Sequence, residues 1–140
     1  MKNCGFAFIA DFPDDMIDEG EGEDWHVVRP GGMAMAQAVT EILRNAGIAI
    51  SDPEPDLEHE CWELMVPRGA KGFDVGVYQI GEDQSVMVWG SSPLLKRLFN
   101  RRDAYAEYLR TLGRGLRRDS RFSNVQLIDV NRRPISEEQA

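Results

Sequence analysis

Apolar and polar residues alternate along this chain at two spacings, which predict helices in some stretches and strands in others. In residues 33–47 apolar side chains recur at the spacing of a helix's buried face, and Gly47 stands where helices commonly end. A second helical pattern begins at Pro93, breaks, and restarts at Asp103, a residue type that caps helices. The sequence therefore predicts one helix in the first half of the chain and a longer helical region, running to about residue 118, in the second half.

Strand-like patterns occupy most of the remaining apolar stretches. Residues 4–12 alternate large and small side chains, and residues 73–80 place apolar residues at alternate positions. Further extended segments are expected at residues 25–28, 48–51, 61–66, 85–90 and 122–130. Short connectors between the three middle runs favour antiparallel pairing, because parallel strands need long crossovers. The order β-α-βββ-α-β predicts an α+β two-layer sandwich, a mainly antiparallel sheet with two helices packed on one face.

The length and composition are those of one globular domain. We place the domain at residues 1–130 and expect residues 131–140 to form a polar tail that frays. No apolar run approaches the roughly 20 residues that span a bilayer, and the N-terminus lacks the apolar core of a signal peptide. We therefore expect a cytoplasmic protein with no membrane partner, whose Cys4 and Cys61 are reduced.

Charge is divided unevenly along the chain, whose net charge is −8. Residues 1–66 hold 15 acidic and 3 basic residues, whereas residues 67–140 hold 9 acidic and 13 basic ones. The acidic balance argues against nucleic acid as the main partner, because phosphate binding needs a dominant basic face. The uneven distribution points instead to a protein partner with a basic surface.

Two acidic segments are the candidates for that contact. Residues 11–24 contain eight carboxylates, and residues 52–60 form a second acidic stretch with two prolines. We interpret both as surface loops, which are either simply solvated or in contact with a basic partner. A calcium loop does not fit the first segment, because no Asp there starts the required series of ligands. The predicted contact residues are Asp14, Asp15, Asp18, Glu19, Glu21, Glu23, Asp24, Glu54, Asp56 and Glu58.

The chain has few of the residues and motifs that commonly serve catalysis or metal binding. The only histidines are His26 and His59, and no G-x-S-x-G motif is present. His59 and Cys61 are too close in sequence to match zinc-ligand spacing, and we interpret Cys61 as a structural thiol. The glycines before residue 33 lack a phosphate-loop motif. We therefore expect no catalytic residues, no metal and no cofactor.

The basic second half leaves two alternatives open. We interpret most arginines between residues 93 and 121 as a solvated helix exterior. Some of them are expected to form ion pairs with the acidic half, either within the fold or across a homodimer. The three tryptophans are expected in the core. A small-molecule binding protein or enzyme, with a carboxylate and arginine pocket between sheet and helices, is the alternative to a protein-binding module.

Four short runs together resemble a group of small bacterial proteins. They are A-x-A-x-A-x-x-E-x-L-x-x-x-G at residues 34–47, C-W-E at 61–63, L-x-R-L-F at 95–99 and R-R-D-S-R-F-S-N-V at 117–125. The group is akin to the immunity proteins that neutralise polymorphic toxins of bacterial secretion systems. The resemblance implies a compact, acidic, non-catalytic protein that covers the active cleft of a cognate toxin, for instance the basic cleft of a nuclease. It carries over no defined site residues.

Overall fold

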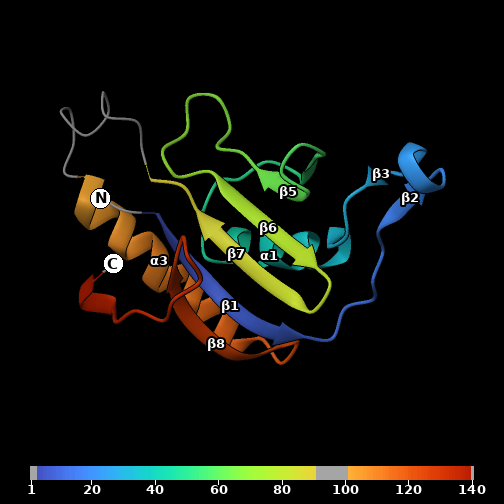
Figure 1. The fold of residues 1–140 in the computed structure, drawn as a ribbon. Helices are drawn as coiled ribbons and strands as arrows, with labels where there is room; N and C mark the ends of the chain where they lie inside the picture. Colours follow the sequence, from blue (N-terminus) through green and yellow to red (C-terminus); the bar gives the residue numbers. More distant parts are fainter. Residues whose placement is uncertain (1–2, 91–100, 140) are drawn as a thin grey trace.

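The computed structural model describes residues 3–90 and 101–139, which form one six-stranded sheet, two long helices and a separate two-stranded hairpin (Figure 1). The strands are β1 (Cys4–Ala10), β2 (Ile17–Glu19), β3 (His26–Arg29), β4 (Glu54–Asp56), β5 (Cys61–Leu64), β6 (Val75–Ile80), β7 (Asp83–Val88) and β8 (Phe122–Asp129). The helices are α1 (Met33–Asn45) and α3 (Arg101–Arg118), and short 3-10 turns occupy Gly22–Asp24 and Glu137–Gln139. No helix in the described part of the chain is long and apolar enough to cross a membrane.

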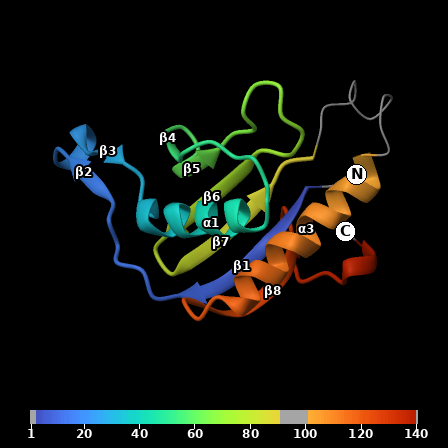
Figure 2. The same cartoon turned by 180° about the vertical axis from the view of Figure 1, so that it is seen from behind.

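The large sheet has the strand order β4-β5-β6-β7-β1-β8, and every pairing in it is antiparallel. Strands β4 to β7 form a meander, and β1 lies between β7 and the last strand, β8. Both helices cover the same face of this sheet (Figure 2). The α+β two-layer sandwich predicted from the apolar pattern is therefore confirmed.

The core lies between that face and the helices. Phe6 and Phe8 of β1 point into it, as do alternate residues of β6 and β7, because successive side chains of a strand face opposite ways. The apolar face of α1 contributes Met35 and Leu43, which are fully buried. Burying a side chain of this size stabilises the fold by about 1.5–3 kcal/mol relative to leaving it exposed.

Two glycines let α3 approach its neighbours closely. A Cβ on Gly113 would lie 2.7 Å from the ring of Phe6, and one on Gly115 would lie 2.4 Å from Ile42 of α1. Glycine weakens an isolated helix by about 1 kcal/mol relative to alanine. Here it is required by packing, because any side chain at these positions would push the helix away from the core.

The structure differs from the predicted elements in several places. Residues 48–51, predicted as extended, lie outside every strand, while the acidic segments predicted as loops contain β2 and β4. Helix α3 is continuous from Arg101, so Asp103 lies in its first turn rather than at a cap. The predicted helical residues 93–100 fall outside the described residues. Trp25, expected in the core, is 49% exposed.

The segment after β8 folds back along that strand. The Ile135 amide donates to the Leu127 carbonyl at 3.0 Å, and Ile128 forms a bridge with Pro134. Ile135 packs against the core. These contacts bring Glu137, within the stretch predicted to fray, to the side of α3.

Candidate functional site

The first acidic segment forms a projecting hairpin made of β2, a 3-10 turn and β3, which we call the acidic hairpin (residues 14–29). It extends beyond the end of α1, away from the large sheet (Figures 1 and 2). Gly20 makes its turn, with a φ of 84°, and a Cβ there would lie 2.2 Å from the Asp24 carbonyl oxygen. Only glycine allows this close return of the chain.

Asp15 fixes the hairpin to α1. Helix α1 begins after Gly32, which has no side chain to cap the first free amides of the helix. The Asp15 carboxylate takes that role from 17 residues upstream: Oδ1 accepts hydrogen bonds from the amides of Gly32 (2.6 Å) and Met33 (3.3 Å), and Oδ2 accepts one from Ala34 (3.1 Å). A carboxylate at this position also interacts favourably with the positive end of the helix dipole. Asp15 therefore has a structural function that the sequence analysis did not assign to it.

Two further contacts hold the base of the hairpin. Arg29 donates from Nη2 to the Asp15 carbonyl at 2.9 Å, which closes β3 against the chain before β2. The buried indole of Trp62 donates from Nε1 to the Pro30 carbonyl at 3.0 Å. The base of the hairpin is thus tied to α1 and to β5.

The outer part of the hairpin combines carboxylates with exposed apolar side chains. Trp25 is 49% exposed, and Met16, Ile17 and Val28 are each exposed by more than two fifths. The exposed carboxylates of the same hairpin are Asp14, Asp18, Glu19, Glu21, Glu23 and Asp24. Exposed apolar residues occur singly on most proteins, but four within one short hairpin mark a surface suited to binding.

The Trp25 side chain is held in place although it is exposed. Its Nε1 donates to Asp18 Oδ2 at 2.8 Å. On the next residue, His26 Nδ1 lies 3.0 Å from the Asp24 carbonyl oxygen, and its Nε2 lies 3.9 Å from a Glu19 carboxylate oxygen. The hydrogen bond to Asp18 orients the exposed indole, and the His26 contacts link the two strands of the hairpin beside it.

The second acidic segment (residues 52–60) has a different character. It contains β4 and so forms an edge of the large sheet, apart from the hairpin (Figure 2). Glu54 and Glu58 are exposed, but Asp56 is half-buried and bonded to His59, with Nδ1 and Oδ2 at 2.6 Å. The hydrogen bond from His59 lowers the pKa of Asp56 to about 2, and Asp56 in turn raises the pKa of His59 above 6.5. The predicted contact residues are therefore divided between two separate surfaces.

The pairing of β4 with β5 places Asp56, Cys61 and Glu63 close together, which their spacing in the sequence did not predict. Asp56 lies directly opposite Cys61, and single donor atoms of Asp56, Cys61 and Glu63 all lie within 4.8 Å of one another. Burial raises the pKa of the Cys61 thiol to about 11, and a hydrogen bond with Asp56 raises that of Glu63. The raised pKa keeps the Cys61 thiol protonated at neutral pH, whereas Asp56 and Glu63 share a hydrogen bond.

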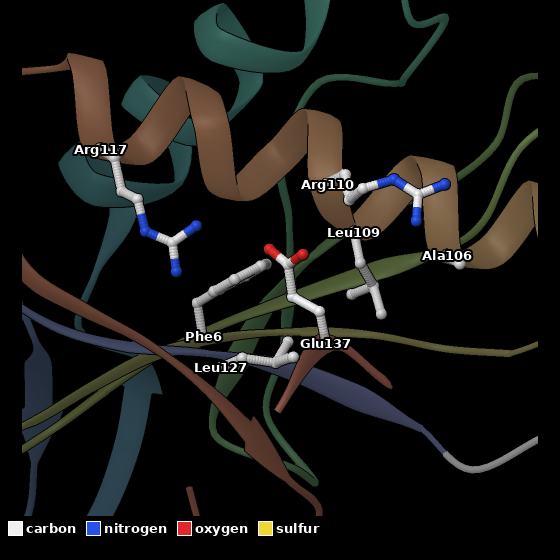
Figure 3. Close-up of a pocket in the computed structure, with 7 residues that line it drawn as sticks. All are labelled: Phe6, Ala106, Leu109, Arg110, Arg117, Leu127 and Glu137. Atoms are coloured by element: carbon white, nitrogen blue, oxygen red, sulfur yellow. The ribbon is translucent and has the colours of Figure 1, made fainter. Parts of the chain in front are cut away.

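The alternative prediction, a small-molecule binder, requires a hollow between the helices and the sheet. Two hollows are relevant to it. One, of about 490 Å³, lies beside α1, where Arg44 pairs with Asp52 at 2.9 Å. Another lies between α3 and the sheet, where Arg110, Arg117 and Glu137 surround an apolar floor (Figure 3). The second combines two arginines and a carboxylate between sheet and helix, but its enclosed volume is only about 20 Å³.

Comparison with known protein families, curated proteins and solved structures finds no match to this chain. The resemblance to immunity proteins thus stays an expectation from the sequence. The hairpin's carboxylates were predicted from the sequence as contact residues, but its exposed apolar residues were not. Their signal was present, because Met16, Ile17 and Trp25 lie within a run otherwise made of acidic residues and glycine.

Proposed function

We propose that this protein is a non-catalytic binding module whose acidic hairpin docks onto a basic surface of a partner protein. The observation that carries the proposal is the exposed Trp25, bonded to Asp18 on a projecting hairpin that carries six exposed carboxylates. Tryptophan is among the residues that most often dominate the affinity of protein interfaces. Apolar anchors with a charged rim are the usual anatomy of such interfaces.

The two kinds of residue have separate functions in this proposal. Carboxylates at the rim attract a basic surface over distances of about a Debye length, roughly 8 Å at physiological salt, and so increase the association rate. Trp25 and its apolar neighbours bury their surface in the partner and so slow dissociation. Neither function needs a catalytic group on this chain.

The partner that fits best is a bacterial toxin with a basic active cleft, as the sequence resemblance implies. A projecting hairpin suits insertion into a concave cleft better than a flat sheet does. In a nuclease the cleft binds the substrate's phosphates through basic residues. Carboxylates such as Glu21 and Glu23 would take the positions of those phosphates. The protein would then act as the cognate immunity protein of that toxin.

The experiment is affinity capture from the native cell followed by an activity assay of the captured protein. Wild type is compared with a hairpin variant, Glu21→Lys/Glu23→Lys/Trp25→Ala, and a matched variant of the second acidic segment, Glu54→Lys/Glu58→Lys/Leu57→Ala. We expect a basic protein on wild type and on the matched variant but not on the hairpin variant, and we expect stoichiometric inhibition of that protein's activity by wild type. Equal capture by all three, or a captured enzyme that stays fully active in the complex, would contradict the proposal.

A further inference from the structure

Helix α3 presents a basic surface that the acidic hairpin does not explain. Arg110, Arg114, Arg117 and Arg118 are spaced by four, three and one positions, which places them on one side of the helix. Together with Glu137 they line a hollow of about 310 Å³. We call these four residues the arginine face. A concentration of positive charge on a chain with a net charge of −8 calls for a physical reason.

Interactions within the fold account for only part of this charge. Arg110 pairs with Glu107 at 3.0 Å, and Arg117 lies 5.7 Å above the Phe6 ring. In the described part of the chain neither Arg114 nor Arg118 has an ion pair or a side-chain hydrogen bond. The helix dipole favours the last-turn residues Arg117 and Arg118, but not Arg110 and Arg114, which lie earlier.

A carboxylate of the chain itself already lies between two of these arginines. Glu137 projects from the C-terminal segment into the space between Arg110 and Arg117 (Figure 3). The floor beneath it is made of Phe6, Leu109 and Leu127, and the enclosed cavity measures only about 20 Å³. This cavity is little larger than one water molecule, so a ligand must be recognised by its charge above the floor.

We propose that the arginine face binds a small, multiply charged phosphate compound, with Glu137 as an internal competitor for the site. Four guanidinium groups carry more positive charge than Glu137 and Glu107, the ion-pair partner of Arg110, together neutralise. Arginine's planar donors match phosphate oxygens in pairs, and a chain of two or three phosphates supplies enough oxygens for several arginines at once. The hollow is within the size range of small-ligand sites.

The class of ligand follows from the extent of the basic surface. A nucleic acid strand needs a long basic track, whereas here the arginines cover about two turns of one helix on an otherwise acidic protein. A nucleoside diphosphate or triphosphate and an inorganic polyphosphate share the required chemistry. This inference is independent of the docking function proposed for the hairpin, and each can fail without the other.

The test is isothermal titration calorimetry of the full chain with inorganic triphosphate in 0.15 M NaCl. We expect saturable binding at one site, weakened about tenfold by Arg114→Ala, since one charge-assisted hydrogen bond is lost. Arg68→Ala, which removes an exposed arginine from a distant loop, is the matched control and leaves binding unchanged. Glu137→Gln removes the competing carboxylate and tightens binding about threefold, a change typical of one exposed charge near the site.

Parallel titrations distinguish the sources of phosphate. Adenosine triphosphate that binds as tightly as inorganic triphosphate, or more tightly, supports the site and identifies nucleotides as candidates. An absence of saturable triphosphate binding would overturn the proposal. Equal weakening by Arg68→Ala and Arg114→Ala would also overturn it, as would tighter binding of a single-stranded 20-mer DNA than of triphosphate. Melting curves of each variant confirm that the exposed substitutions leave the fold intact.

Discussion

The two acidic segments have the same appearance in the sequence and different organisation in the structure. Residues 14–29 project as a hairpin in which six carboxylates stay exposed and Trp25 is fixed at the surface. Residues 52–60 lie along the sheet edge, where Asp56 is bonded to His59 and Asp52 is paired with Arg44. Acidity alone therefore does not identify a binding surface. In the hairpin the exposed carboxylates share one projection with a tryptophan that Asp18 orients, whereas in the second segment Asp56 and Asp52 are paired with basic residues of the fold.

The largest difference in partner affinity is expected between truncation of Trp25 in the hairpin and truncation of Leu57 in the second segment. Trp25→Ala should weaken binding to the captured partner about 30-fold or more, because a desolvated tryptophan is worth about 2 kcal/mol or more at an interface centre. Leu57→Ala removes a side chain that is 52% exposed in the second acidic segment and should change affinity less than twofold. Biolayer interferometry with immobilised partner measures both. Comparable losses from the two substitutions would remove the distinction between the segments.

The free energy of unfolding should differ between variants of Asp15 and Asp52, which both contact other parts of the fold. Asp15→Ala removes three hydrogen bonds to the start of α1 and should lower the free energy of unfolding by about 2 kcal/mol. Asp52→Ala breaks an ion pair in which the aspartate side chain is 88% exposed, and should cost less than about 0.5 kcal/mol. Urea denaturation followed by circular dichroism gives both values. If Asp15→Ala were as mild as Asp52→Ala, the hairpin would not be anchored as described.

Charge reversal tests whether the carboxylates steer the partner. Glu21→Lys/Glu23→Lys should slow association about tenfold in low salt and reduce its dependence on salt, while the dissociation rate changes little. The same reversal in the second segment, Glu54→Lys/Glu58→Lys, should have a smaller effect on association because it lies away from the hairpin. Stopped-flow kinetics at several NaCl concentrations provides the comparison. A salt dependence unchanged by the hairpin reversal would place the carboxylates outside the interface.

The smallest effect is expected from the His59–Asp56 pair. Because the pKa of His59 is raised in the folded protein, the protonated imidazole stabilises the fold fully below pH 6.5, and this contribution is lost as pH rises through the raised value. The contribution of Asp56, whose pKa is lowered to about 2, is present above pH 3.8 and lost as pH falls toward 2. His59→Gln should therefore abolish part of the stability decline above pH 6.5 in melting curves. Identical pH profiles for wild type and variant would show that the pair does not contribute.

Much of the fold could be predicted from the sequence because burial imposes periodicity. Strands β6 and β7 and helix α1 have one face in the core, and their apolar spacing showed it. The short strands β2 and β4 could not be found in this way, since both lie almost wholly exposed. Gly113 and Gly115 weakened the helical pattern for a reason that only packing against Phe6 and Ile42 explains.

The candidate site could be predicted only as a charge pattern. The two acidic segments are visible in the sequence. That one projects as a hairpin and the other forms a sheet edge with paired charges depends on contacts between distant residues. Asp15 caps a helix 17 residues later, and Asp56 meets Cys61 only through strand pairing. Likewise Glu137 meets the arginine face only because the final residues fold back along β8. Long-range placement of this kind leaves no signature in local spacing.

The most direct test of the docking claim is a paired affinity measurement with the captured partner. The hairpin variant Glu21→Lys/Glu23→Lys/Trp25→Ala and the second-segment variant Glu54→Lys/Glu58→Lys/Leu57→Ala carry matched substitutions: two charge reversals and one exposed apolar side chain truncated to alanine. In 0.15 M NaCl we expect the hairpin variant to bind the partner at least about 100-fold more weakly than wild type, and the second-segment variant to bind within about threefold of wild type. Equal losses in the two variants, or the larger loss in the second-segment variant, would contradict the assignment of the acidic hairpin as the docking surface.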